Sequence, residues 1–277
     1  MLRGVLPPVV AALILVSAFG ARTLPLAMVA GLFVADVLLV KQWPALPHEL
    51  WSEPDGQQWL LWSLVALGLV TAAEHFRLLP RRLAASAGVA VAAFAVLLML
   101  EKVRLAQGWS DGQVWTFVGG GGLLAAMLVW SQRRVLTRAP RSILPGILWT
   151  VALSLDAVIV TNGDSALLGQ LCGAVAAALG AAIGCRLWRK DFALQSADGM
   201  WLGLAHGLFL LAGVQLAYLE WTPALIALCA PLLLLALPKG FGEERTWRWV
   251  LAASPLLLAP LAVAVWLSLP EANPYGY

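Results

Sequence analysis

The chain has 277 residues, of which 61% are apolar and only 12% are charged, and its mean hydropathy is +0.84. An average soluble domain is about a quarter charged and about half apolar, so this chain has too little polar surface to cover a water-soluble globule of its size. These values exclude a soluble protein, a disordered chain and a nucleic-acid-binding domain. They predict an all-α, polytopic transmembrane helix bundle with no soluble domain.

Ten apolar runs are long enough to cross a bilayer, which takes about 20 residues of helix. They lie at 5–21, 24–40, 58–74, 83–100, 114–130, 143–161, 165–187, 199–219, 222–238 and 249–269. Only Arg22, Thr23 and Pro25 separate the first two runs, so residues 5–40 form either a tight hairpin or one broken helix. The first run resembles a signal peptide, but a second run follows at once, and we expect it to be retained as a span.

The distribution of Lys and Arg predicts the orientation of the chain. One set of alternating connections carries 14 basic residues, from Arg22 to Arg248, and the other set carries only Arg3, Lys41, Lys102 and Arg104. Since cytoplasmic loops are the basic ones, both termini are predicted to lie outside a cytoplasmic (inner) membrane. The net charge of +3 thus reflects topology signals, not a nucleic-acid partner.

Short connections indicate a single integral membrane domain over residues 1–277. Ten spans also allow two five-span halves, 1–130 and 143–270, in the inverted-repeat arrangement of many transporters, although the two halves show no visible similarity. The longest connection, 41–57, is predicted to be an interfacial loop; the alternative is a short helix on the membrane surface that serves as a lid or docking surface.

Small residues recur at helical spacing in the seventh and eighth spans, where they allow close helix approach in lipid. Gly169, Gly173 and Ala177 begin such a series, and Gly199 and Gly203 begin another. We therefore expect both spans to be buried, packed against each other. The run 119–122 of four glycines lacks the spacing of a phosphate-binding loop and favours a close helix crossing or a weak point in the helix.

No motif in the sequence indicates a cofactor or a metal site. The three cysteines, Cys172, Cys185 and Cys229, fall inside apolar runs, with no CxxC pair and no His–Cys cluster. They are expected to act as small apolar residues in packing. A haem held by His75 and His206 is disfavoured, and His206 is expected to be a buried, neutral, hydrogen-bonded histidine.

Ionisable residues inside a membrane are costly and are candidates for function by default. A set of polar groups is predicted at similar depth in the outer half of the bundle. Its members are Asp36, Asp156, Asn162, Gln170, Gln215 and Tyr218, with His206 as a further candidate nearer the inner side. Gln215 and Tyr218 are three residues apart, which places them on one helix face. The hypothesis is a polar cavity open to the outside with Asp156 as its protonatable centre; the alternative is that each group is satisfied separately.

Three functions are consistent with these features. The first is a transporter or permease for small molecules or lipids. The second, ranked nearly level with it, is a non-catalytic subunit of a larger membrane assembly with other membrane proteins as partners. The third is an enzyme that acts on a lipid-linked substrate from outside, using carboxylates such as Asp36 and Asp156. No nucleophile elbow, paired-aspartate magnesium motif or Walker A sequence is present, so the sequence indicates no particular reaction.

Overall fold

The structure is a computed structural model, and it describes residues 2–50, 55–139, 141–185, 193–237 and 246–269. All regular secondary structure in these ranges is helical, as predicted. The α-helices are α1 (Leu2–Phe19), α2 (Leu24–Val40), α3 (Gly56–His75), α4 (Arg81–Gln107), α5 (Asp111–Arg138), α6 (Leu144–Asn162), α7 (Ala166–Gly184), α8 (Ser196–Leu216), α9 (Trp221–Leu233) and α10 (Thr246–Ser268). The predicted C-terminal ends of the seventh span, at 186–187, and of the ninth span, at 238, lie outside the described residues.

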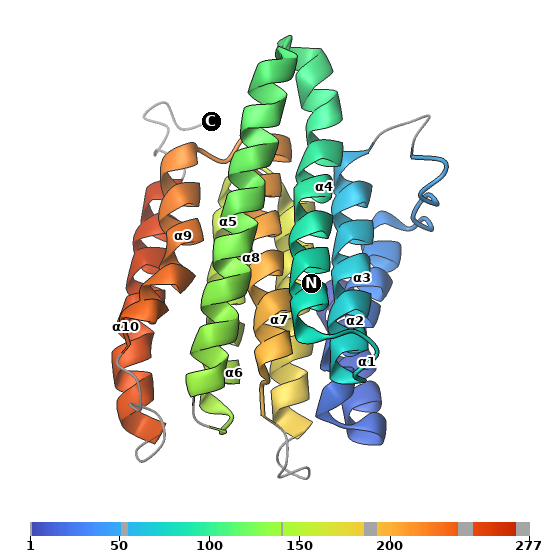
Figure 1. The fold of residues 1–277 in the computed structure, drawn as a ribbon. Helices are drawn as coiled ribbons and strands as arrows, with labels where there is room; N and C mark the ends of the chain where they lie inside the picture. Colours follow the sequence, from blue (N-terminus) through green and yellow to red (C-terminus); the bar gives the residue numbers. More distant parts are fainter. Residues whose placement is uncertain (1, 51–54, 140, 186–192, 238–245, 270–277) are drawn as a thin grey trace, which may run out of the picture.

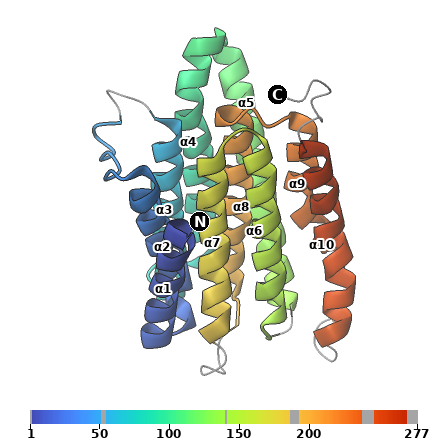
Figure 2. The same cartoon turned by 180° about the vertical axis from the view of Figure 1, so that it is seen from behind.

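Eight of these helices are long and apolar enough to cross a membrane, and α1 and α9 are shorter apolar helices. The chain is therefore a polytopic membrane-helix bundle. Its helices run roughly parallel and antiparallel to one another, with α9 and α10 at one edge and α1 to α3 at the other (Figures 1 and 2). Helix α8 lies between α4 and α5 on one side and α6 and α7 on the other. Accordingly, every residue from Ala197 to Gly213 is buried.

The first two apolar runs form the tight hairpin, not a single broken helix. Gly20 has φ 87°, a left-handed conformation that glycine adopts without strain, and a 3₁₀ turn over Ala21–Thr23 follows it. The Thr23 hydroxyl then donates to the carbonyls of Gly20 and Leu15, at 2.8 and 3.1 Å. These bonds satisfy the backbone where α1 ends and α2 begins.

Helices α4 and α5 extend well beyond the predicted spans 83–100 and 114–130 and form a hairpin that projects past its neighbours (Figure 1). The sequence prediction ended these spans at charged residues, but Glu, Lys and Arg are good helix formers and do not end a helix. The observed ends are set by capping residues. Gly108 closes α4 with φ 65°, and Ser110 opens α5 with a capping box to Gln113.

The connection that begins at Lys41 is an irregular loop over its described part, 41–50, and residues 51–54 lie outside the described residues. It packs against the start of α3. The Trp62 indole N–H donates to the Ala45 carbonyl at 2.9 Å, and the Ala45 N–H donates to Gln58 at 2.8 Å. These contacts support the interfacial-loop prediction over a surface helix.

The glycine series mediate close helix contacts, but with neighbours other than those predicted. A Cβ atom at Gly199 would lie 2.9 Å from the Gln132 carbonyl of α5, and one at Gly169 would lie 2.8 Å from the Ala157 carbonyl of α6. The prediction that the two glycine faces pack against each other is therefore wrong. The spacing shows that one face of a helix carries only small residues, but it does not show which neighbouring helix packs against that face. Around Gly119 there is open space.

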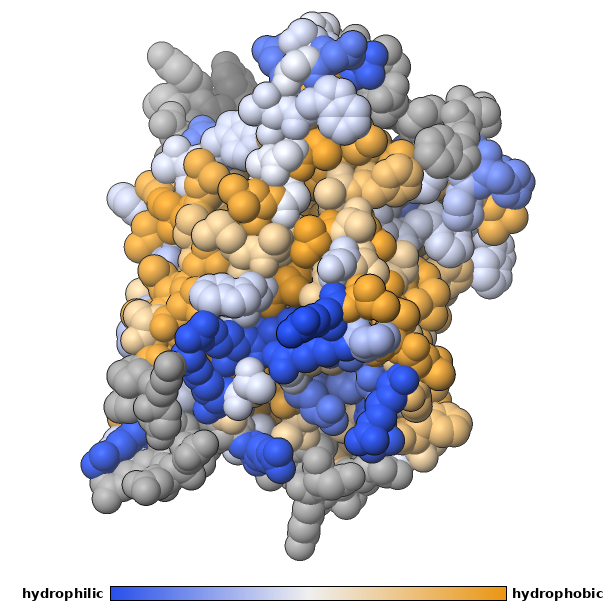
Figure 3. All heavy atoms as spheres, in the orientation of Figure 1, coloured by the Kyte–Doolittle hydropathy of each residue, from blue (hydrophilic) through white to orange (hydrophobic). Residues whose placement is uncertain are grey.

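The surface divides into an apolar belt and two polar ends (Figure 3). We call the end that holds the α3/α4 and α5/α6 connections the basic end; it lies at the bottom of Figures 1 and 3. The opposite end holds the α4/α5 hairpin. Exposed tryptophans occur toward both ends, including Trp43 and Trp115 at the opposite end and Trp130 near the basic end. Tryptophan is enriched at such boundaries because its ring is amphipathic.

Candidate functional site

An acid–base pair lies in the core of the bundle between α6 and α8. The His206 ring nitrogen Nδ1 is 2.6 Å from Asp156 Oδ2, and both side chains are fully buried. The two residues come from the middle of helices that have no charge within several residues of either. An ionisable pair at this depth is expensive to bury, so it is a candidate for function.

A proline in α9 frees a carbonyl that bonds His206. In an α-helix the Ala227 carbonyl would accept a hydrogen bond from the N–H of residue 231, but Pro231 has no N–H. The free carbonyl instead lies 3.1 Å from His206 Nε2. A carbonyl can only accept, so Nε2 carries the hydrogen and donates it. The proline thus sets the tautomer of a histidine on another helix.

Because Nε2 is already protonated, the protons of the pair can be counted. One proton lies between Nδ1 and Oδ2, either on histidine beside a carboxylate or on aspartic acid beside a neutral imidazole. Both forms are neutral overall. Removing this proton leaves one negative charge in the core, and adding another leaves one positive charge. The pair is therefore a site at which one proton can be held or exchanged.

The surroundings of the pair are apolar and incompletely satisfied. Trp149 packs edge-on against the His206 ring, with centroids 6.1 Å apart. Cys172 is fully buried and donates to the Leu153 carbonyl at 3.4 Å. The second carboxyl oxygen of Asp156, Oδ1, is buried and has no hydrogen-bond partner among the described residues. An unsatisfied buried oxygen of this kind is uncommon and requires an explanation.

Two further pairs lie nearer the basic end. His75 Nε2 is 2.8 Å from Asp198 Oδ1, and the other carboxyl oxygen of Asp198 accepts the Gln195 N–H at 2.7 Å, at the start of α8. Arg133 and Glu74 form a two-bonded ion pair, with one N···O distance of 2.9 Å. The sequence placed Arg133 in a loop, but α5 continues past it and buries it.

The predicted polar set does not come together around one cavity. Asp156 meets His206, which the sequence placed at a different depth. Asn162 donates to Ser268 of α10 at 3.1 Å. Asp36 is buried on α2, and Gln170 is exposed on α7. Within this set, only Asp156 and His206 bond each other. The enzyme hypothesis would have paired Asp156 with the carboxylate of Asp36, but its partner is a histidine.

The shared face predicted for Gln215 and Tyr218 is wrong. Helix α8 ends at Leu216, and Tyr218 has φ 54° in the turn that follows. The three-residue spacing places two side chains on one face only within a continuous helix. Gln215 is half-buried, whereas Tyr218 is 86% exposed.

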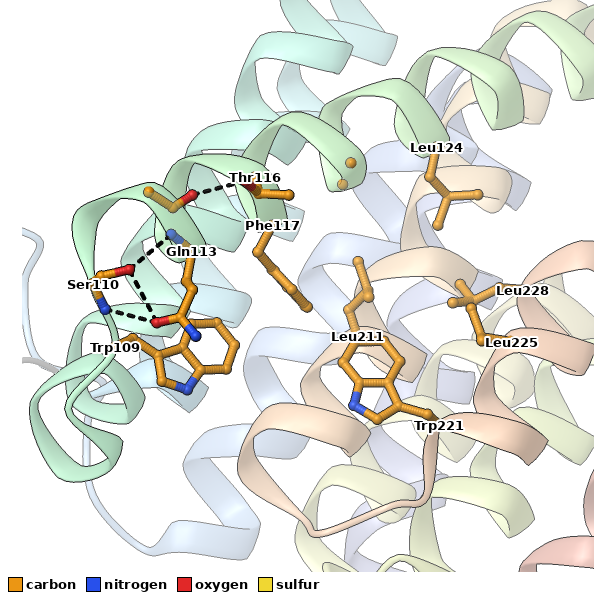
Figure 4. A pocket seen from close by; sticks show the side chains of 13 residues that line it. Trp109, Ser110, Gln113, Thr116, Phe117, Leu124, Leu211, Trp221, Leu225 and Leu228 are labelled. Carbon is orange, nitrogen blue, oxygen red and sulfur yellow. Dashed lines mark hydrogen bonds between the residues drawn. The ribbon is translucent and has the colours of Figure 1, made fainter.

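A cavity of about 1020 Å³ opens between α5, α8 and α9 toward the opposite end (Figure 4). Three aromatic rings follow one another along it: the centroids of Trp109 and Phe117 are 5.8 Å apart, and those of Phe117 and Trp221 are 5.5 Å apart. The remainder of the lining is mostly leucine, glycine and a few neutral polar side chains. These residues are Ser110, Gly112, Gln113, Thr116, Gly120, Gly121, Leu124, Leu211, Leu225 and Leu228.

This cavity and the pair share two helices, α8 and α9. Leu228 lines the cavity, and the preceding residue, Ala227, accepts the hydrogen bond from His206. Leu211 lines it from α8, five residues after His206. Any movement of α9 relative to α8 would therefore change both the cavity and the His206 bond. Of the glycine run 119–122, Gly120 and Gly121 lie along the wall of this cavity. A Cβ atom at Gly121 or Gly122 would also lie 3.3 Å from Val96 or 3.5 Å from Ala93 of α4, which agrees with the predicted close helix crossing at these two positions.

The sequence contains a signal for the hydrogen bonding of His206. A proline in an apolar helix leaves the carbonyl four residues earlier without a donor, so Pro231 predicts an acceptor at Ala227. Lipid offers no donor to such a carbonyl, and a polar side chain of a neighbouring helix is one group that can supply it. Gln132 plays a related part, since its amide donates to the Pro231 carbonyl at 2.8 Å.

The arrangement also bears on the haem hypothesis. Both ring nitrogens of His206 are engaged, one by Asp156 and one by Ala227. His75 has its own carboxylate partner in Asp198. His206 therefore offers no free ring nitrogen to an iron in this conformation, so a haem held by both histidines is not supported. Within the described residues, no group of three or more His, Cys, Asp and Glu side chains is placed to hold a metal ion.

Comparison with protein-family models, with curated proteins and with solved structures finds no match to this chain. What the residues themselves establish is a polytopic membrane-helix bundle with a buried aspartate–histidine pair beside an aromatic cavity.

Proposed function

We propose that the chain is a transporter that moves small amphipathic molecules and couples this movement to a proton carried by Asp156 and His206. The observation that carries the proposal is the buried pair itself, which holds one exchangeable proton in an apolar core. Buried carboxylates and histidines serve as proton relays in membrane pumps and transporters.

The cavity lined by Trp109, Phe117 and Trp221 supports the substrate class. Its walls are aromatic and aliphatic, its polar groups are neutral, and its size suits a small molecule. The Gln113 carbonyl is bonded to Ser110, and its amide group remains to donate to a ligand. Aromatic faces also attract cations, so neutral and cationic aromatic compounds are the preferred ligands.

The proposal includes an orientation. The basic end lies in the cytoplasm, so both termini and the aromatic cavity lie toward the outside of a cytoplasmic membrane. A C-terminal alkaline phosphatase fusion tests this, because the enzyme is active only outside the cytoplasm. We expect activity from this fusion and none from a fusion inserted after Arg141. The reversed pattern would overturn the orientation and leave the pair unaffected.

Transport is tested with the full chain in liposomes that contain a pH-sensitive dye. A panel of neutral and cationic aromatic fluorescent compounds is added under an inward proton gradient, and dye and probe signals are recorded together. We expect accumulation of a subset of compounds with proton entry. The Asp156→Asn/His206→Gln double variant can retain amide hydrogen bonds in place of the pair but cannot hold its proton. It should lose gradient-driven accumulation.

The matched control is Ser154→Ala. Ser154 lies on the same helix as Asp156 but is exposed, and its hydroxyl bonds only the Thr150 carbonyl at 2.8 Å. This variant should transport like the unaltered chain. Gradient-driven accumulation by the double variant would show that the pair does not carry the coupling proton. Failure of the unaltered chain to move any compound would contradict the substrate class.

One observation favours a second candidate, a non-catalytic subunit of a larger membrane assembly. Gly119 is exposed on α5 and has open space around its Cβ position, as expected for a face that receives another helix. Affinity purification from native membranes in a mild detergent, followed by mass spectrometry, tests this. A stoichiometric set of other membrane proteins that is lost in a Gly119→Leu variant would support the subunit.

A further inference from the structure

A second large cavity is a groove of about 940 Å³ between α4 and α5, on the bundle face shown in Figure 3. It begins at the basic end, where hydrophilic residues gather in the lower part of that view, and continues toward the apolar belt. Its lining combines arginines with small apolar residues. These residues are Arg81, Arg82, Ala85, Ser86, Val89, Ala90, Ala93, Ala126, Val129, Trp130, Arg133, Arg134 and Thr137.

The charge of the groove is unbalanced. Four arginines line it and no acidic residue does, within the described part of the chain. Glu74, which does not line the groove, forms an ion pair with Arg133 and neutralises its charge. Arg81 donates to the Ser196 hydroxyl at 3.0 Å, which leaves its charge uncompensated. An anionic group is the natural complement of such a concentration of guanidinium groups.

The two arginines that α5 contributes differ in burial. The Arg133 side chain is 6% exposed and paired with Glu74, and its buried Nε atom has no hydrogen-bond partner among the described residues. Arg134 is held over the Trp130 ring, with its guanidinium carbon 5.1 Å from the ring centroid. This contact orients the Arg134 charge at the edge of the groove.

The apolar part of the groove identifies the kind of anion. Above the arginines, Val89, Ala90 and Ala93 of α4 face Ala126 and Val129 of α5 across the groove. These side chains lie where lipid acyl chains would surround the bundle. A free phosphate would use only the arginines, whereas a phospholipid would fill both parts, with its headgroup on the arginines and one acyl chain along the small residues. Basic pockets between membrane helices bind anionic lipid headgroups in this manner.

We infer that this groove is a binding site for one anionic phospholipid, with its phosphate held by Arg82 and Arg134 and an acyl chain laid between α4 and α5. The inference stands apart from the proposed transport function, since it uses neither the aromatic cavity nor the Asp156–His206 pair. Arg82 and Arg134 belong to different helices, so a bound phosphate would also join α4 to α5 at the basic end.

The test is native mass spectrometry of the purified full chain in a non-ionic detergent. It is titrated with phosphatidylglycerol and, separately, with phosphatidylcholine of the same acyl chains. We expect phosphatidylglycerol to bind about tenfold tighter or more, and the Arg82→Gln/Arg134→Gln double variant to lose about tenfold in phosphatidylglycerol affinity. The matched control is Arg22→Gln/Arg141→Gln. It removes two exposed charges of the same end outside the groove and should change the affinity less than about twofold.

Two further arms separate a lipid from a free anion and from misfolding. Ala90→Trp fills the apolar part of the groove without a change of charge, at an exposed position that tolerates a large side chain. It should weaken phosphatidylglycerol binding, and thermal unfolding curves verify that each variant is folded. Equal losses in the groove and control double variants would overturn the inference. Complete displacement of the lipid by millimolar inorganic phosphate would overturn it as well, since the site would then hold a free anion.

Discussion

Two buried aspartate–histidine pairs share the central helix α8, and they differ in how fully their atoms are satisfied. At the basic end, one oxygen of Asp198 faces His75 and the other accepts the Gln195 N–H as part of a capping box. In the middle of the bundle, one oxygen of Asp156 faces His206, and the other has no partner among the described residues. Both carboxyl oxygens of Asp198 thus have hydrogen-bond partners, whereas only one oxygen of Asp156 does among the described residues.

The difference suggests different roles. A carboxylate whose oxygens are all bonded, at a helix start, stabilises that start and has little reason to change its protonation. A carboxyl with one free oxygen, deep in the core, can accept another proton or a ligand group without breaking an existing bond. The histidines differ too: His206 bonds Asp156 and the Ala227 carbonyl, whereas His75 Nε2 bonds Asp198.

The largest effect is expected from Asp156→Ala. It leaves His206 in an apolar core without its acidic partner, and breaking a buried pair in this way costs about 3–5 kcal/mol. Thermal or denaturant unfolding in detergent measures the loss. The Asp156→Asn/His206→Gln double variant should recover most of it. A double variant no more stable than Asp156→Ala would contradict the view that loss of the pairing causes the effect.

Asp198→Ala should cost less, about 1–3 kcal/mol, because it removes an N-terminal capping contact and one side-chain bond near the end of the bundle. Unfolding of the variant in the same detergent gives the value. Transport coupling should survive. If Asp198→Ala abolished coupling in a folded protein while Asp156→Asn/His206→Gln did not, the assignment of roles to the two pairs would be reversed.

Two glycines of α7, Gly169 and Gly184, allow a tightly packed position to be compared with an open one on the same helix. In α7, a Cβ at Gly169 would lie 2.8 Å from the Ala157 carbonyl, whereas one at Gly184 would meet nothing within 4 Å. Gly169→Ala should therefore cost about 1–3 kcal/mol through overpacking. Gly184→Ala should be neutral or stabilising by up to about 1 kcal/mol through helix propensity. Equal unfolding free energies for the two variants would refute the packing assignment of α7.

The smallest effect on stability, and the most specific, is expected from Pro231→Ala. The new N–H can bond the Ala227 carbonyl within α9 and so compete with His206. The ¹⁵N spectrum of histidine-labelled protein should then show a changed Nε2 signal for His206 and an unchanged one for His75. An unaltered His206 signal would mean that the proline does not set its tautomer.

Much of the fold could be predicted from the sequence, and some of the site could. The helical architecture and the burial of His206 follow from apolar length and the neighbouring glycines. The sequence left residues 5–40 open between a hairpin and one broken helix, and the turn at Gly20 decides for the hairpin. The ends of α4 and α5 were missed because charged residues were taken as helix ends, although capping residues determine them. Arg133 was therefore placed in a loop and its ion pair with Glu74 was not foreseen.

The sequence by itself determined that this chain is a helical membrane protein, because its apolar runs are long enough to cross a bilayer and backbone groups in lipid must be satisfied within helices. It did not determine which helices touch, since a face of small residues accepts any neighbour of suitable shape. Only the tertiary structure brought Asp156 to His206, and His206 to the carbonyl freed by Pro231. Those contacts join side chains and a carbonyl on three different helices, α6, α8 and α9, and close packing in three dimensions decides which of them meet.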